Sequence, residues 1–143
     1  MNSRSIFVNT RKQLGFTLLE LLVVIAVIGV LASLAVPRFQ NYIKKAKFVE
    51  VVNAAAPYKM AVEVCVQRTG GETACDAGAE GVPAAVTTAS GVIASIAVIN
   101  GKITITGTIV VDEKNYILTP TVNAGAVNWS QGGTCEAASL CEP

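Results

Sequence analysis

The chain has 143 residues and a mass of 14.8 kDa, which suits one domain of ordinary size. It contains no histidine, and its 11 basic residues nearly balance its 10 acidic ones. These counts exclude histidine-based acid/base catalysis, zinc sites that need imidazole, an intrinsically disordered chain and a multi-span membrane protein. Apolar residues make up 52% of the chain, and their excess is concentrated near the amino terminus.

Residues 16–36 form this apolar segment, in which 17 of 21 residues are apolar. As a helix it would be about 31 Å long, close to the ~30 Å hydrocarbon thickness of a bilayer. The segment has no polar stripe, which excludes an amphipathic surface helix. A secretory signal peptide cut near Ser33 is an alternative, but the segment is longer than a usual signal core and contains the acidic residue Glu20.

Glu20 is the chemically unusual residue of the apolar segment, because an ionisable group in a membrane span is by default a functional hypothesis. A carboxylate in a membrane span is expected to pair with a positively charged group. If the chain were cut between Gly15 and Phe16, the new amino terminus would lie one helical turn away, or on a neighbouring copy. The alternative is that Glu20 complements the helix dipole in the first turn.

Residues 15–20 have the sequence Gly-Phe-Thr-Leu-Leu-Glu and are followed by the rest of the apolar segment and then Pro37. This arrangement resembles the start of type IV prepilins. The resemblance implies that residues 1–15 are a cytoplasmic leader. Prepilin peptidase would cleave between Gly15 and Phe16 and methylate Phe16, and Glu20 would neutralise the amino terminus of an adjacent subunit during assembly. It also implies that the helix can unwind between Gly29 and Pro37 in filaments, and the alternative is simple kinking.

Residues 38–68 are predicted to continue as an amphipathic helix. Apolar residues recur there every three or four positions and predict a core-facing stripe: Phe39, Tyr42, Ala46, Val49, Val52, Ala56, Met60 and Val64. Pro57 should kink this helix without ending it, and Gly70-Gly71 should stop it. On the other side, Lys44, Lys45 and Lys47 form either a solvated face or a contact with acids on a neighbouring subunit.

A β-sheet is predicted after a loop at residues 69–91, because isoleucine, valine and threonine dominate there. Residues 93–99 and 102–109 flank Asn100-Gly101, the preferred type I′ turn pair, and predict a hairpin. Residues 115–120 give a third strand and 126–130 a weaker fourth, within a sheet region at 92–130. The expected fold is α+β, a long helix on an antiparallel sheet of three or four strands, which resembles the pilin fold.

Four cysteines lie in a chain that is expected to be exported, so two disulfides are favoured over a metal site. The sequence by itself allows three connectivities, of which the local one pairs Cys65 with Cys75 and Cys135 with Cys141. The resemblance implies a disulfide in the carboxy-terminal region, residues 131–143, which Cys135 and Cys141 match. Cys65 and Cys75 would be an addition to that pattern.

No nucleophile–base pair, phosphate-binding loop or metal-ligand motif is present, so we expect neither an enzyme nor a cofactor. The resemblance implies a type IV pilus subunit, processed by prepilin peptidase and polymerised with identical copies by inner-membrane assembly machinery. It would span the inner membrane at residues 16–37, with the head at 38–143 outside, and then enter a surface pilus that serves adhesion, twitching motility and DNA uptake. From residue 48 onward the net charge is −5, which argues against direct nucleic-acid binding.

Three alternatives stay open. A pseudopilin of a type II secretion system shares the amino-terminal motif, but the acidic calcium loop typical of major pseudopilins is not found after Val127. A minor pilin is the second alternative. A small soluble secreted binding module is the third, and it requires cleavage at the Ser33-Leu34-Ala35 site, so that the mature chain begins at Val36.

Overall fold

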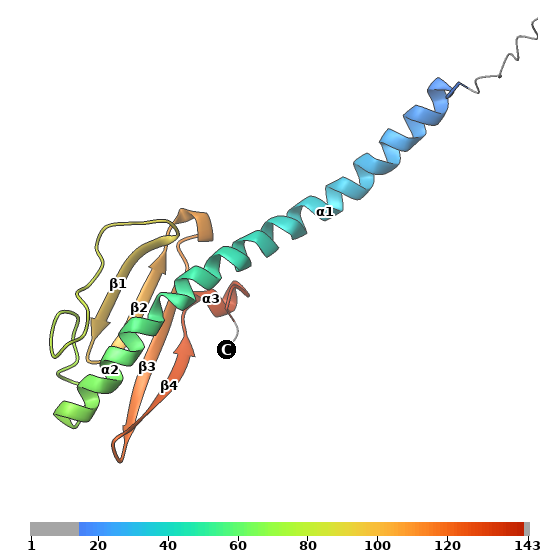
Figure 1. Cartoon of the computed structure of the whole chain (residues 1–143). Helices are drawn as coiled ribbons and strands as arrows, with labels where there is room; N and C mark the ends of the chain where they lie inside the picture. The colour runs from blue at the N-terminus through green and yellow to red at the C-terminus, as the bar shows by residue number, and fades with distance from the viewer. Residues whose placement is uncertain (1–14, 142–143) are drawn as a thin grey trace, which may run out of the picture. The chain divides into compact units, whose positions relative to one another are not determined.

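The computed structural model describes residues 15–141 and divides into two compact units, one ending at Arg38 and one beginning at Phe39 (Figure 1). Apart from Gly15, the leader predicted at residues 1–15 lies outside the described residues. The second unit is the head: helices on one side and a four-stranded antiparallel sheet on the other. The expected α+β fold is therefore confirmed.

Two helices account for the long helical region, α1 at Leu18–Asn53 and α2 at Ala55–Thr69. They are separated only by Ala54, and the helical run continues past Pro57 to Thr69, so Pro57 does not end the helix, as predicted. Pro57 has no amide hydrogen to donate to the carbonyl of Asn53, and α2 instead begins two residues before it. Proline is tolerated in the first turn of a helix because the amides there have no helical acceptor.

Helix α2 ends where the glycine pair predicts. Gly70 adopts the left-handed conformation with φ 81°, and its amide donates to the carbonyl of Val66. A glycine favours this conformation because it has no Cβ. The prediction that the helix stops at Gly70 is confirmed.

The sheet has the order β1-β2-β3-β4, with strands at Ile93–Ile99, Lys102–Gly107, Asn115–Asn123 and Ala126–Gly132. The turn between β1 and β2 is the one predicted, because Asn100 and Gly101 have φ of 50° and 72°. The predicted second strand at 102–109 is two residues too long. The chain leaves the sheet after Gly107 and forms a 3₁₀ turn, η1, at Ile109–Val111, which places Val111 fully inside the core.

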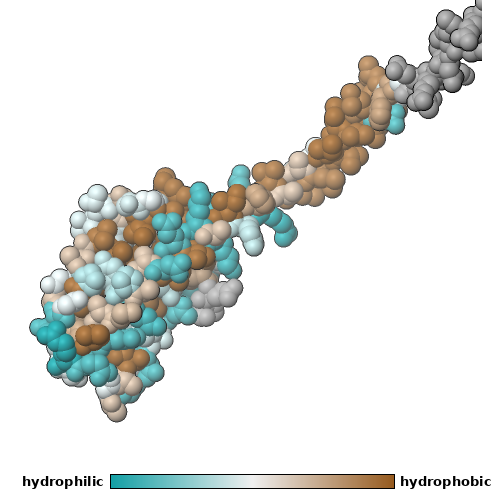
Figure 2. Space-filling view, viewed as in Figure 1, coloured by the Kyte–Doolittle hydropathy of each residue, from teal (hydrophilic) through white to brown (hydrophobic). Residues whose placement is uncertain are grey.

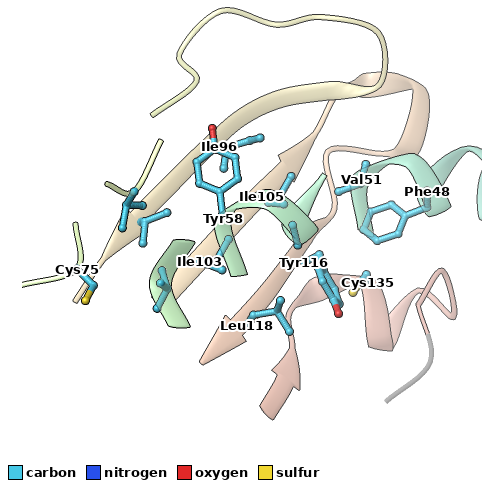
Figure 3. Close-up of a cluster of buried hydrophobic side chains, with 14 of the residues drawn as sticks. Phe48, Val51, Tyr58, Cys75, Ile96, Ile103, Ile105, Tyr116, Leu118 and Cys135 are labelled. Carbon is cyan, nitrogen blue, oxygen red and sulfur yellow. The ribbon is translucent and has the colours of Figure 1, made fainter. Parts of the chain in front are cut away.

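Two rows of side chains cross the sheet and form the floor of the core (Figure 3). Val98, Ile103 and Leu118 make one row, and all three are at most 5% exposed. Ile96, Ile105 and Tyr116 make the other. The neighbouring Thr104 and Thr106 are less buried, as the alternation in this strand predicts.

The helical side of the core is a different face from the predicted one. The buried residues are Phe48, Val51, Ala55, Tyr58, Val62, Cys65 and Val66. Of the eight residues in the predicted stripe, Val52 is half-buried and the other seven are exposed. The helix has apolar residues on two opposite faces, so the spacing of three and four fits either. We call the exposed one the outer face: Tyr42, Ala46, Val49, Ala56, Met60 and Val64.

Both local disulfides are present, Cys65–Cys75 and Cys135–Cys141. The first joins the end of α2 to the loop that precedes the sheet. There the amide of Gly101 donates to the carbonyl of Cys75, and the amide of Asn100 donates to Asp76 Oδ1. The second joins α3, at Thr134–Ala137, through Cys135 to Cys141. At the other edge, Trp129 Nε1 donates to Glu63 Oε1 at 2.8 Å, which holds β4 to α2.

Candidate functional site in the apolar segment of α1

The apolar segment begins with a side-chain cap. The Oγ1 atom of Thr17 accepts a hydrogen bond from the amide of Glu20 at 3.2 Å, and α1 starts at the intervening Leu18. This is half of a capping box, in which a threonine is followed three residues later by glutamate. Thr17 was not predicted to have this role, although the Thr-x-x-Glu spacing is the signal that predicts it.

Glu20 lies in the first turn of α1 and is exposed. Its backbone amide is held by Thr17, but among residues 15–141 no side-chain partner is found for its carboxylate. A negative charge there faces the positive end of the helix dipole, which stabilises it by roughly 0.3–1 kcal/mol. The carboxylate therefore lies at the start of the helix, without a side-chain partner among the described residues.

The large apolar side chains of residues 16–36 are between 45% and 80% exposed. Figure 2 shows the resulting surface as an almost unbroken hydrophobic rod. The helix is long and apolar enough to cross a membrane by length and composition. Soluble chains rarely expose a continuous apolar surface of this extent, so the segment needs lipid or protein around it.

Three residues of this region, Ser33, Gly29 and Pro37, are not large apolar side chains, and none of them adds an unpaired polar side chain to its surface. Ser33 donates its hydroxyl hydrogen to the carbonyl of Val30 at 2.7 Å, so this group is satisfied within the helix. No atom outside the helix lies within 4 Å of the position that a side chain at Gly29 would occupy. Helix α1 continues through Pro37. The roles of Gly29 and Pro37 in flexibility stay predictions.

Elsewhere the head offers little for catalysis. In the part of the chain that the structure describes, no three acidic, histidine or cysteine side chains gather where they could hold a metal ion. Burial raises the pKa of the Tyr116 hydroxyl, which donates to Gln131 Oε1 at 2.7 Å. This tyrosine is 5% exposed and belongs to the core.

An exposed apolar helix that leads into a disulfide-bonded α+β head is the architecture of a filament subunit. Two family models match the chain, the prokaryotic N-terminal methylation motif over residues 10–36 and the pilin (bacterial filament) family over residues 44–141. The second match covers more than half of the chain. The protein therefore belongs to the pilin family, as a type IV pilin, and is a structural subunit rather than an enzyme.

Curated relatives and a solved structure agree with this assignment. The chain is 37% identical to prepilin peptidase-dependent protein D of Escherichia coli K12 over 109 residues, covering 76% of this chain and 73% of the relative. It is 37% identical to fimbrial protein EcpC of Eikenella corrodens over 135 residues, covering 90% and 88%. The solution structure of the major type IV pilin PpdD from enterohemorrhagic E. coli aligns with a TM-score of 0.55 and 27% identity, covering 66% and 71%.

Proposed function

We propose that this pilin matures by cleavage between Gly15 and Phe16, with methylation of the new amino terminus at Phe16. Residues 1–15 are then a cytoplasmic leader. The methylation-motif match spans the Gly15–Phe16 bond, and a relative that is 37% identical is named as dependent on prepilin peptidase. Loss of the leader removes three basic residues and leaves the mature side chains with a net charge of −2.

The observation that carries the proposed function is the exposure of the apolar segment. A membrane span with no polar face is equally compatible with lipid and with identical helices, since both present hydrocarbon. Residues 16–37 thus serve first as an inner-membrane anchor, with the leader on the cytoplasmic side. Assembly machinery in that membrane then transfers the subunit, and the same residues become the helical core of a surface pilus.

Glu20 guides this transfer. Its carboxylate has no partner within residues 15–141 and follows, by four residues, Phe16, whose amino group is freed by cleavage. In a hydrocarbon environment an unpaired carboxylate costs several kcal/mol, so a subunit gains free energy when Glu20 meets the amino terminus of its neighbour. The pairing therefore favours one axial register between adjacent copies.

Gly29 and Pro37 give the filament core its flexibility. Glycine weakens a helix by roughly 1 kcal/mol relative to alanine, and proline removes one backbone hydrogen bond. The stretch between them is the weakest part of the apolar segment and unwinds first when the filament is extended.

The assembled pilus acts in adhesion, twitching motility and DNA uptake, with residues 38–143 as the head that faces the surroundings. Two relatives carry the words fimbrial and type IV pilus in their names, TapA of Aeromonas hydrophila being 48% identical over 75 residues, 52% of this chain and 53% of the relative. Direct binding of DNA is disfavoured by the net charge of −5 from residue 48 onward. Other chains of the machinery would supply that contact.

Mass spectrometry of the mature chain from cells tests processing. The expected mass begins at a methylated Phe16, and the Gly15→Ala variant should retain the leader. A mature chain beginning at Val36 would instead indicate the soluble secreted module. Electron microscopy of sheared surface filaments then tests assembly, because this chain should be their bulk protein. A trace amount would favour a minor pilin, and its confinement to the periplasm would favour a pseudopilin.

A further inference from the structure

The head exposes an apolar tip in the turn between β2 and β3. Ile109 is 80% exposed and Val110 is 41% exposed, whereas Val111, the last residue of η1, is fully buried. The backbone of the turn is closed by hydrogen bonds from Asp112 to Ile109 and from Val111 and Glu113 to Thr108. Because the turn is ordered without any partner, Ile109 would lose little conformational freedom on binding.

A second apolar feature lies on the outer face of α2. It is a groove of about 560 Å³ lined by Ala56, Pro57, Met60, Ala61 and Val64, with Arg68, Glu80 and Gly81 at its rim. Met60 is 69% exposed and Val64 is 54% exposed. The groove has room for a branched aliphatic side chain and leaves the Arg68 guanidinium, which is 60% exposed, at one end.

The tip and the groove lie at opposite ends of the head. Asp112, next to the tip, forms an ion pair with Lys44 on α1. At the groove rim, Glu80 forms an ion pair with Arg68 on α2. Met60, in the middle of the groove, lies 16 positions after Lys44, or about 24 Å along a nearly continuous helix. The tip and groove of one copy therefore cannot meet each other.

This arrangement indicates a second copy as the occupant of the groove. An open filament requires two different surfaces on each subunit that fit each other, since a patch that fits only itself gives a closed dimer. The head has such a pair, a protruding apolar tip and an apolar groove. The rim of the groove is charge-balanced, because Arg68 pairs there with Glu80, so the fit between the two surfaces is an apolar one.

We infer that, in the pilus, the Ile109 tip of one subunit docks into the outer-face groove around Met60 of another subunit. The inference rests on the proposed function, because it requires a polymer of this chain. It adds a head-to-head contact to the helical core. Each contact is small, but it repeats at every subunit, so its loss weakens the whole filament.

Photo-crosslinking in assembled filaments tests this contact directly. A benzoylphenylalanine placed at residue 109 of the full chain should crosslink to a second subunit, and peptide mapping should find the adduct on the segment that contains Met60. The same probe at Ile99, which is 63% exposed at the end of β1, is the matched control and should not label that segment. Adducts from residue 109 on any other surface of the subunit would overturn the inference.

A charge exchange gives an independent measurement. Ile109→Asp and Met60→Lys each place a lone charge in the apolar contact and should reduce filament yield by about tenfold, a loss of ~1.4 kcal/mol per contact. The double variant pairs the two charges and should recover most of the yield. Both side chains are exposed, so the monomers should fold, which a thermal melt checks.

The outcomes separate the two proposals. A wild-type chain that forms no filaments defeats the proposed function itself. Wild-type filaments that tolerate both single variants, or a double variant no better than its parents, would defeat the tip-and-groove contact while leaving the pilus function intact.

Discussion

Lys44 donates hydrogen bonds to both carboxylate oxygens of Asp112, at 2.9 and 2.8 Å. This pair joins α1 to the turn that follows η1, across 68 residues of sequence. The sequence left open whether Lys44 is solvated or contacts an acid on a neighbouring subunit. The structure shows that it binds an acid of its own chain and so helps to hold the Ile109 tip in place.

Removing this ion pair should have a small effect on stability. The two side chains are 36% and 49% exposed, and exposed pairs contribute about 0.2–1 kcal/mol. Asp112→Asn is the suitable variant because asparagine tolerates the φ of 57° at this position. Denaturant unfolding in detergent should show a loss below 1 kcal/mol, and Glu113→Gln, at φ 53°, should show less. A loss of several kcal/mol would mean that the pair is not screened by solvent.

Glu20→Leu should insert into the membrane normally but assemble poorly. The substitution removes the proposed partner of the neighbouring amino terminus while making the segment more apolar. Cell fractionation measures insertion, and counts of surface filaments measure assembly. Glu20→Asp keeps the charge and should restore part of the filament yield. If the leucine variant formed pili normally, Glu20 would not be needed for assembly, and its role would be limited to the interaction with the helix dipole.

Opening the Cys65–Cys75 disulfide should destabilise the head by about 2–3 kcal/mol, through the added conformational freedom of the unfolded chain. The double variant Cys65→Ala/Cys75→Ala should also become sensitive to proteases between residues 70 and 91, since Cys75 anchors that loop beside the β1–β2 turn. Limited proteolysis with peptide mapping measures this. The matched variant Cys135→Ala/Cys141→Ala should instead open the carboxy-terminal region, and identical cleavage patterns would contradict the local roles of the two disulfides.

Gly107 should not accept a side chain. A Cβ there would overlap the side chain of Val111, which is fully buried, and would lie 3.2 Å from the carbonyl oxygen of Lys114. Overpacking of this kind costs about 1–3 kcal/mol, so Gly107→Ala should lower the thermal midpoint clearly. Gly132→Ala is the matched control in β4, where nothing lies within 4 Å. Equal midpoints for the two variants would show that Val111 can move aside.

Tyr116 should make the head sensitive to alkaline pH. Burial raises the pKa of its hydroxyl above the ordinary value of 10.0. The folded state thus holds this proton more tightly than the unfolded state does, so the contribution to stability is complete below pH 10 and is lost as the pH rises through the folded pKa.

The Tyr116→Phe variant removes this pH dependence, together with the hydrogen bond to Gln131. Its free energy of unfolding should be lower at neutral pH and should decline less steeply in alkaline solution. Tyr42→Phe, at a position that is 74% exposed, should retain the wild-type decline. Parallel pH profiles for wild type and Tyr116→Phe would show that another group controls alkaline unfolding.

The features that depend on residues close to one another in the sequence could be predicted from the sequence. The Asn100-Gly101 pair gave the hairpin because both residues tolerate positive φ, and Gly70 gave the end of α2 for the same reason. Seventeen apolar residues in 21 marked the exposed segment, and Thr17 and Glu20 together carried a cap signal that could have been used. Each of these depends on backbone sterics or local composition.

Contacts between distant residues decided the rest. The helix of the head has two apolar faces, and only the rows Val98–Ile103–Leu118 and Ile96–Ile105–Tyr116 select the face of Phe48 and Val62 as the buried one. The same core draws Val111 inward and ends β2 at Gly107. Periodicity along a chain shows that a face can be buried, but the free energy of burial is gained against a complementary surface, and that surface exists only once the sheet has formed.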